Sequence, residues 1–140
     1  MTTDVRWRQR LQNFERAVEV LVRVCDAADA DAPSEVERLA LIQAFEMAHE
    51  LSWLTLKDLL EFEGVTGLVA SRSTVREAYA HGLLEDGQVW MDMITDRNRA
   101  SHLYDESVAA AVAMRIAGTY RSRFTSLAAA LRARANAEDA

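Results

Sequence analysis

Residues 34–60 read SEVERLALIQAFEMAHELSWLTLKDLL and decide the fold, because they describe one long helix with a defined beginning. Ser34 and Glu37 form the capping-box pattern, in which each side chain accepts a hydrogen bond from the other residue's backbone N–H. Apolar residues then recur every three or four positions on two adjacent stripes, and so wide a band predicts contact with more than one other helix. One stripe carries Leu39, Ile42, Phe45, His49, Trp53, Leu56 and Leu60, and the other carries Leu41, Ala44, Ala48, Leu51 and Leu59.

The segment before residue 34 predicts another long helix and a loop. The helix should run from about Thr3 to Ala28, because its apolar residues fall on one helical face. The polar stretch Asp26–Pro33 is then the connecting loop, and Gly64 and Gly67 end the helix of residues 34–60. The inward residues of this first helix are Trp7, Leu11, Phe14, Val18, Leu21 and Cys25.

The C-terminal half predicts two shorter helices and a last long one. The first runs from Ser71 to His81 with Gly82 just past its end, and the second is capped by Asp86. After a break, a long helix extends from about Asp105 to Ala135, and a frayed tail follows at residues 136–140. The inward residues of the long helix are Val108, Val112, Ile116, Tyr120, Phe124, Leu127 and Leu131.

Three long helices and one shorter one predict an antiparallel up-and-down four-helix bundle, with the helix of residues 71–81 as an extra element. A chain of 140 residues is typical of a single domain, which we expect to span residues 1–140. Five glycines and one proline are too few turn-forming residues for an all-β protein.

Charge and cysteine content exclude several classes of protein. The chain has 16 basic and 22 acidic side chains, a net charge of −6, which is not the strongly basic balance of a protein that coats nucleic acid. Cys25 is the single cysteine, so no internal disulfide is expected and a reducing cytoplasm is the expected location. No apolar run approaches the roughly 18–20 residues that span a bilayer, so no membrane association is expected. The charged N-terminus lacks the apolar core of a signal peptide.

Glu46 and His49 have the Glu-x-x-His spacing that di-iron helical bundles use. Such a site needs a second copy, and the residues three positions before the other two histidines are Ala78 and Arg99. We therefore reject a metal site, expect no cofactor, and expect His49 to be a buried or half-buried core residue. The sequence also lacks a phosphate-binding glycine loop and the nucleophile motifs of hydrolases.

Residues 96–105, DRNRASHLYD, concentrate polar groups where a bundle helix would show apolar spacing. On a continuous helix Arg97 and His102 would point about 140° apart, so they converge only where the helix breaks. The Asn and Ser residues of the segment favour such a break. Two interpretations stay open: a site that binds phosphate and moves a proton, or a polar junction in which Asp96 and Arg97 cap helix ends.

This polar segment resembles the signature motif of the HEPN superfamily (higher eukaryotes and prokaryotes nucleotide-binding domain), with the spacing R-N-x-x-x-H-x-Y over Arg97, Asn98, His102 and Tyr104. Other stretches are similar to the bacterial nucleotidyltransferase substrate-binding protein branch of that superfamily, and the resemblance spans about Trp7 to Leu131. They are Phe45-Glu46, Glu50-Leu51-x-Trp53, Leu56-Lys57-Asp58, Arg76-Glu77-Ala78 and Asp86-Gly87-x-x-Trp90.

The resemblance implies a bundle similar to the C-terminal domain of aminoglycoside nucleotidyltransferases. It also implies a homodimer whose Arg–His segments face each other, and a separately encoded minimal nucleotidyltransferase as partner. Two activities are attached to such pairs: a non-catalytic adaptor subunit that binds substrate, or a metal-independent ribonuclease of a toxin–antitoxin module. The partner would silence such a ribonuclease by transferring AMP to the motif tyrosine. A scaffold dimer with a purely structural motif is a third alternative.

For a ribonuclease, the resemblance implies a role for each motif residue. His102 would be the general base on a ribose 2′-hydroxyl, since an ordinary histidine pKa of about 6.5 suits proton transfer near neutrality. Arg97 would stabilise the charge that develops on the phosphate. Asn98 would position the phosphate or brace Arg97, Arg99 would bind the substrate, and Tyr104 would be the modified residue.

Glu50 and Lys57 lie seven residues apart on one face of the helix of residues 34–60. The resemblance assigns them to substrate binding, in a dimer cleft or a nucleotide pocket. Ordinary ion pairs with Arg97 or Arg99 are the alternative. Asp105 and Glu106 are expected to cap the last helix, where carboxylates suit the positive end of the helix dipole.

Overall fold

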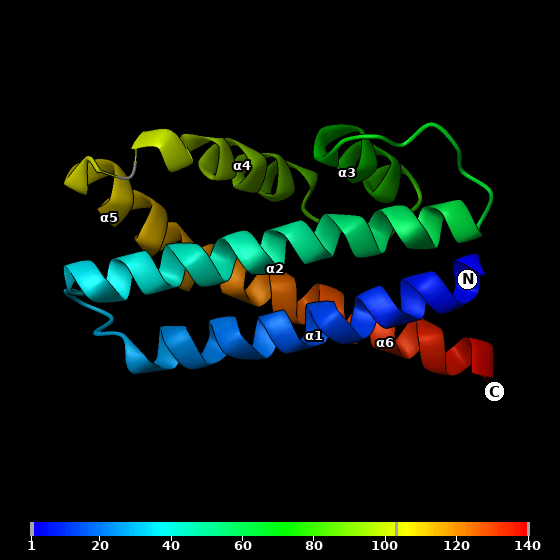
Figure 1. Ribbon diagram of the computed structural model, residues 1–140, viewed down its shortest axis with the longest axis horizontal. Coiled ribbons are helices and arrows are strands. Elements are labelled where there is room, and N and C mark those ends of the chain that lie inside the picture. Colours follow the sequence, from blue (N-terminus) through cyan, green and yellow to red (C-terminus); the bar gives the residue numbers. More distant parts are fainter. Residues whose placement is uncertain (1, 103, 140) are drawn as a thin grey trace.

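The computed structural model describes residues 2–102 and 104–139, and all regular structure in those ranges is helical (Figure 1). The expected all-α bundle is therefore confirmed. In chain order the elements are α1 (Thr3–Ala27), α2 (Glu35–Phe62), α3 (Ser71–Ala80), α4 (Gly87–Asn98), the 3-10 turn η1 (Arg99–His102), α5 (Glu106–Arg115), the π segment η2 (Ile116–Tyr120) and α6 (Arg121–Asp139).

The bundle is arranged around α2. Helices α1 and α2 pack against each other along their lengths as an antiparallel hairpin, and α5 and α6 lie behind it (Figure 1). The short helices α3 and α4 follow one another along the other side of α2. Because α2 contacts α1, α3, α5 and the π segment, its wide apolar band has several partners. Both chain ends lie at one end of the bundle, and the α4–α5 junction lies at the other (Figure 1).

The core contains most of the expected inward stripes. All six stripe residues of α1 are buried, and so is the stripe of the last helix apart from Val108, which is partly buried. Leu39, predicted to face the core, is instead 49% exposed. It lies near the beginning of α2, where it lines a shallow surface pocket with Arg38 and Tyr104.

Local signals set most helix ends. The capping box of α2 is confirmed: Ser34 Oγ accepts a hydrogen bond from the Glu37 N–H at 3.1 Å, and Glu37 Oε1 accepts one from the Ser34 N–H at 2.9 Å. Gly82 follows α3 with a φ of 76°, a left-handed conformation that favours glycine. Asp86 precedes α4, but its expected capping bond is wrong, because its carboxylate pairs with Arg123 of α6 at 2.6 Å.

The last long helix contains a π segment that sequence reasoning missed. Its buried residues Val112, Ile116, Tyr120 and Phe124 are each four positions apart. In an ideal α-helix, side chains four residues apart differ in direction around the helix axis by about 40°, so a row of such residues drifts around the helix. The wider turn of Ile116–Tyr120 cancels much of this rotation and keeps the later side chains in the core. A run of four-residue spacings was the signal that could have predicted it.

Helix α6 continues to Asp139, beyond the end at about Ala135 that the apolar spacing predicts, and the fraying of residues 136–140 stays a prediction. Arg8 of α1 anchors this end through its guanidinium, which is 3.1 Å from the carboxylates of both Glu138 and Asp139. Ala140 lies outside the described residues.

We expect Gly118→Ala to raise the free energy of unfolding by about 0.5–1 kcal/mol, because alanine loses less backbone entropy in a helix than glycine does. Gly118 is in the π segment, has no left-handed φ, and a Cβ there would meet nothing within 4 Å. Urea unfolding measures the effect, with Gly82→Ala as the control that should destabilise. A loss of stability in Gly118→Ala would contradict the assignment of a relaxed helical backbone at this turn.

Candidate functional site

The polar segment of residues 96–105 is a helix junction, as its composition predicts. Helix α4 ends at Asn98, the 3-10 turn follows, and α5 begins after Asp105. The Asp105 carboxylate accepts hydrogen bonds from the hydroxyl of Ser107 at 2.7 Å and from its backbone N–H at 2.9 Å, and these bonds hold the pKa of Asp105 below its ordinary value. The expected break and the expected cap by Asp105 are both confirmed.

Asp96 ties this junction to the other helices. Its Oδ2 accepts hydrogen bonds from Arg115 Nε at 2.7 Å and from the Tyr120 hydroxyl at 2.5 Å, and its Oδ1 accepts one from Arg115 Nη2 at 2.7 Å. Burial alone would raise the pKa of Asp96, but the bonds from Arg115 and Tyr120 outweigh burial and hold it below its ordinary value. The end of α4 is thereby fixed to α5 and to the π segment.

Sequence reasoning gave Asp96 only a capping role and missed this network. The signal was a spacing of three: Trp90, Met93 and Asp96 follow one another on the inward face of α4. An acid at an inward position needs a buried cation or hydroxyl as partner. The spacing does not say which residue supplies that partner, since Arg115 and Tyr120 come from another helix.

Arg97 lies half-buried between α4 and α2, with its Nη1 3.1 Å from Oε2 of Glu46. The alternative for Glu50, an ion pair with Arg97 or Arg99, is wrong. Glu50 accepts a hydrogen bond from the indole N–H of Trp53 at 3.2 Å, and Arg99 lies 3.7 Å from Asp96. The partner of Arg97 is thus one turn nearer the beginning of α2 than expected.

His49 lies one turn after Glu46 and is a core residue, as expected. Its side chain is buried against Phe45, with 5.9 Å between the ring centroids, and neither ring nitrogen has a hydrogen-bond partner among the described residues. Burial, and to a smaller extent the charge of Arg97, lowers the pKa of His49 to about 4. The imidazole is therefore neutral near pH 7.

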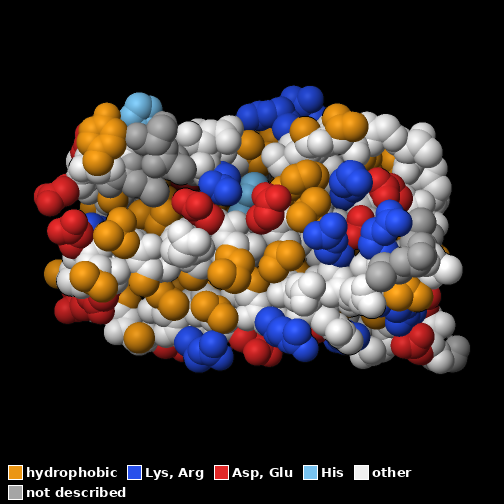
Figure 2. All heavy atoms as spheres, in the orientation of Figure 1, with side chains coloured by type: hydrophobic (Ala, Val, Ile, Leu, Met, Phe, Trp, Pro, Cys, Tyr) orange, Lys and Arg blue, Asp and Glu red, His pale blue; other side chains and the backbone are white. Residues whose placement is uncertain are grey.

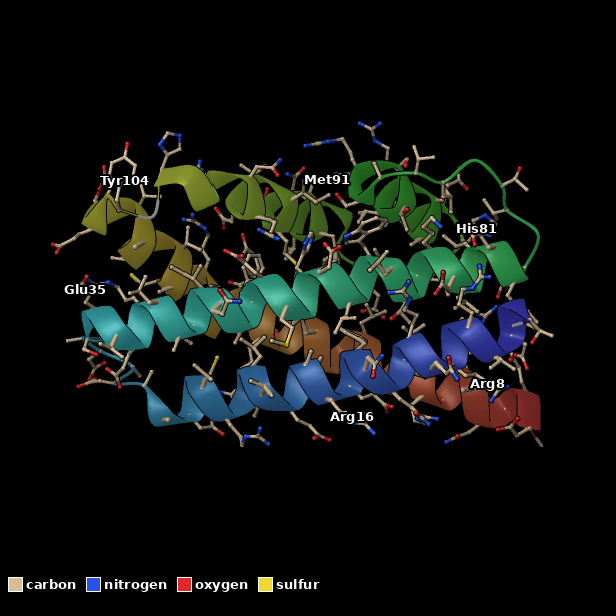
Figure 3. All side chains as sticks on the ribbon, viewed as in Figure 1. Arg8, Arg16, Glu35, His81, Met91 and Tyr104 are labelled. Carbon is tan, nitrogen blue, oxygen red and sulfur yellow. The ribbon has the colours of Figure 1, made fainter. Side chains whose placement is uncertain are left out.

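His102 and Tyr104 lie on the surface of the junction. Their ring centroids are 6.3 Å apart, and Tyr104 is 84% exposed. Figure 3 shows Tyr104 projecting away from the bundle, at the same end of the molecule as Glu35. No hydrogen bond between the described side chains joins Arg97 to His102, so their convergence on one substrate stays a prediction.

The remaining predicted substrate residues do not all gather at the junction, because Lys57 lies about three turns beyond Glu46 along α2, toward the chain ends. Asn98 and Arg99 are exposed at the end of α4, and Lys57 pairs with Glu61 at 2.6 Å. Figure 2 shows basic, acidic and apolar side chains interspersed over α1 and α2, with no single large basic patch among the described residues of this face. Anion binding here would therefore depend on individual arginines rather than on a general positive surface.

Within residues 2–102 and 104–139, no three or more His, Cys, Asp or Glu side chains gather as a metal-binding group. No helix in this part of the chain is long and apolar enough to cross a membrane.

A helical bundle with a polar break of this kind, R-N-x-x-x-H-x-Y, defines a HEPN-type protein. The family model for proteins described as nucleotidyltransferase substrate binding protein like matches residues 9–133. The chain belongs to this family, and the resemblance inferred from the motif is confirmed.

Two individual proteins are similar to this chain. A probable ribonuclease HepT from Haemophilus influenzae is 35% identical over 75 residues, which cover 51% of this chain and 51% of that protein. The chain thus matches about half the length of this relative. A crystal structure of a protein from Thermus thermophilus has a TM-score of 0.70 and 31% identity, and the match covers 87% of this chain and 98% of that one.

We expect Asp96→Asn to lower the free energy of unfolding by about 2–3 kcal/mol, because the amide cannot replace the charge that Arg115 and Tyr120 bond. Asp92→Asn is the matched control, since Asp92 is exposed on the same helix and bonds only Gln88 among the described residues. Surface changes of this kind stay within about 0.5 kcal/mol. Equal urea midpoints for the two variants would contradict the anchoring role of Asp96.

We expect His49 to destabilise the fold progressively as the pH falls from about 6.5 to about 4. The unfolded chain takes up a proton on His49 below its ordinary pKa of 6.5, whereas the folded chain does so only below about 4. The folded state therefore loses up to about 3 kcal/mol of stability through this window.

His49→Leu removes this titration, and urea unfolding at about pH 7 and about pH 5 measures the difference. The variant should lose less stability than the wild type over that interval. Parallel losses in both proteins would show that His49 does not titrate with a lowered pKa.

Proposed function

We propose that this chain is the HEPN-type subunit of a two-component module, whose partner is a separately encoded minimal nucleotidyltransferase, and that the α4–α5 junction binds RNA phosphate and cleaves RNA without a metal ion. The observation that carries the proposal is the break after Asn98. It leaves Arg97 at the end of α4 and puts His102 on an exposed turn, so that both groups of the motif are available at one junction. The similarity to a probable ribonuclease supports the same chemistry.

In the proposed reaction His102 accepts the proton of a ribose 2′-hydroxyl. The 2′-oxygen then bonds to the adjacent phosphorus, the bond from phosphorus to the 5′-oxygen breaks, and the leaving oxygen takes a proton from water. Arg97 stabilises the negative charge on the phosphate oxygens during this step. Asn98 and Arg99, exposed beside it, are the proposed contacts to neighbouring phosphates. Glu50 and Lys57, one and about three turns beyond Glu46 on α2, are proposed to meet parts of the substrate away from the cleaved phosphate.

A homodimer would complete this site in the proposal. One chain presents Arg97 in the α2–α4 interface and His102 on the surface, without a hydrogen bond between them among the described residues. Two junctions that face each other would supply two arginines and two histidines around one phosphodiester.

Tyr104 is the proposed site of control. Its side chain is exposed and beside His102, so a partner nucleotidyltransferase could reach the phenolic oxygen. An AMP group there would add a negative charge and a bulky nucleoside next to the phosphate-binding arginines. Both effects disfavour RNA at the junction.

The test is cleavage of a labelled RNA by the purified chain in excess EDTA, compared with Arg97→Ala and His102→Ala. We expect the wild type to cleave and each variant to lose activity by about 100-fold or more, as happens when one transition-state partner is removed. Cleavage by all three at equal rates would identify a contaminating nuclease. Inert wild-type protein with an unmodified mass would contradict the ribonuclease proposal.

The second candidate function is a non-catalytic adaptor that supplies substrate-binding surface to the nucleotidyltransferase. The family description, substrate binding protein like, favours it. An adaptor would be inert towards RNA, would co-purify with the transferase, and would raise nucleotidyl transfer by that partner. Arg97→Ala would then lower transfer by the complex rather than RNA cleavage.

A further inference from the structure

We propose that Glu46 is a positioning residue, which holds the Arg97 guanidinium in the orientation that the transition state of RNA cleavage requires; this inference rests on the proposed ribonuclease function. Glu46 belongs to the Glu-x-x-His pair of α2, which lacks the second copy that a di-iron site needs. Its position against α4 instead lets the carboxylate pair with Arg97.

The ion pair joins two different helices. Glu46 Oε2 of α2 is 3.1 Å from Arg97 Nη1 of α4, and the side chains are 22% and 34% exposed. A guanidinium has five N–H donors in a fixed plane, so one carboxylate contact orients the group and leaves other donors for a phosphate. Partial burial reduces the screening by water that weakens an exposed ion pair.

The surrounding groups leave Glu46 as the partner of Arg97. Asp96, the neighbouring acid, is committed to Arg115 and Tyr120. His49, one turn along α2, is neutral and buried. Among the described side chains, the carboxylate within ion-pair distance of the Arg97 guanidinium is that of Glu46. Without it, Arg97 would face a buried uncharged ring and would turn towards solvent, where its positive charge is better hydrated.

Positioning predicts opposite effects on binding and on turnover. The Glu46 carboxylate repels the RNA backbone and competes with phosphate for Arg97, so its removal should leave RNA affinity unchanged or raise it. The freed arginine is no longer held for the transition state, so turnover at saturating RNA should fall. A variant that had merely lost local structure would bind RNA less well and also cleave it more slowly.

The experiment compares Glu46→Gln and Glu46→Asp with wild type and Arg97→Ala. Single-turnover cleavage measures the rate. Fluorescence anisotropy measures RNA affinity, with an RNA that carries a 2′-deoxy block at the scissile position. We expect Glu46→Gln to cleave roughly tenfold or more slowly at saturating enzyme, with no loss of RNA affinity. Glu46→Asp keeps the charge on a shorter side chain and should recover part of the rate.

Glu15→Gln is the matched control. Glu15 pairs with Arg132 between α1 and α6, with 29% and 39% exposure of the two side chains, so the change removes a comparable interhelical ion pair far from the junction. This variant should cleave and bind RNA as the wild type does. Thermal unfolding of every variant checks that the bundle is intact.

Three outcomes would overturn the inference. If wild type cleaves in an Arg97-dependent way and Glu46→Gln keeps the wild-type rate, Glu46 does not position Arg97, while the proposed function stands. If Glu46→Gln loses rate and RNA affinity together, its role is structural or in substrate binding. If wild type does not cleave RNA at all, the proposed function fails and this inference fails with it.

Discussion

The buried carboxylate of Asp96 is the constraint on which the polar end of α4 depends. A charge inside a helical bundle is costly unless it is bonded on all sides, and here a guanidinium from α5 and a phenol from the π segment supply the bonds. The wide π turn is part of the same arrangement. Removing one residue from it would rotate Tyr120 by about 100° and carry its hydroxyl away from Asp96. The position of the end of α4 therefore depends on the π turn of the last long helix, because that turn brings Tyr120 within bonding distance of Asp96.

Arginine and carboxylate pairs between helices are a general device in this bundle. Arg132 meets Glu15, Arg121 meets Asp26, and Arg97 meets Glu46. Most individual pairs at half-exposed positions stabilise a fold only weakly. They join α6 to α1 and α4 to α2. Under the proposed function, a chain with a net charge of −6 would in this way present single arginines to an anion without a basic surface.

Features within one segment were predictable from sequence, and pairings between helices were not. The capping box at Ser34 and the break after Asn98 follow from residue type and spacing, and the family motif named the residues that the break exposes. The glutamate of α2 that pairs with Arg97 is Glu46, one turn before Glu50, which had been considered for this pair. Both glutamates lie on one face of α2, and a single sequence does not show which turn of α2 lies beside Arg97. The length of α6 was underestimated for the same reason, since its last turn bonds an arginine of α1 more than a hundred positions earlier.

The clustering of the two chain ends, opposite the α4–α5 junction, has a practical consequence for handling the molecule (Figure 1). An affinity tag, a fluorophore or a fused protein attached at either end would lie the full length of the bundle away from Tyr104 and the motif arginines. Because Arg8 holds the last turn of α6, the two attachment points also lie close to each other. A pair of probes there would report on separation of the bundle's first and last helices while the α4–α5 junction stays unlabelled.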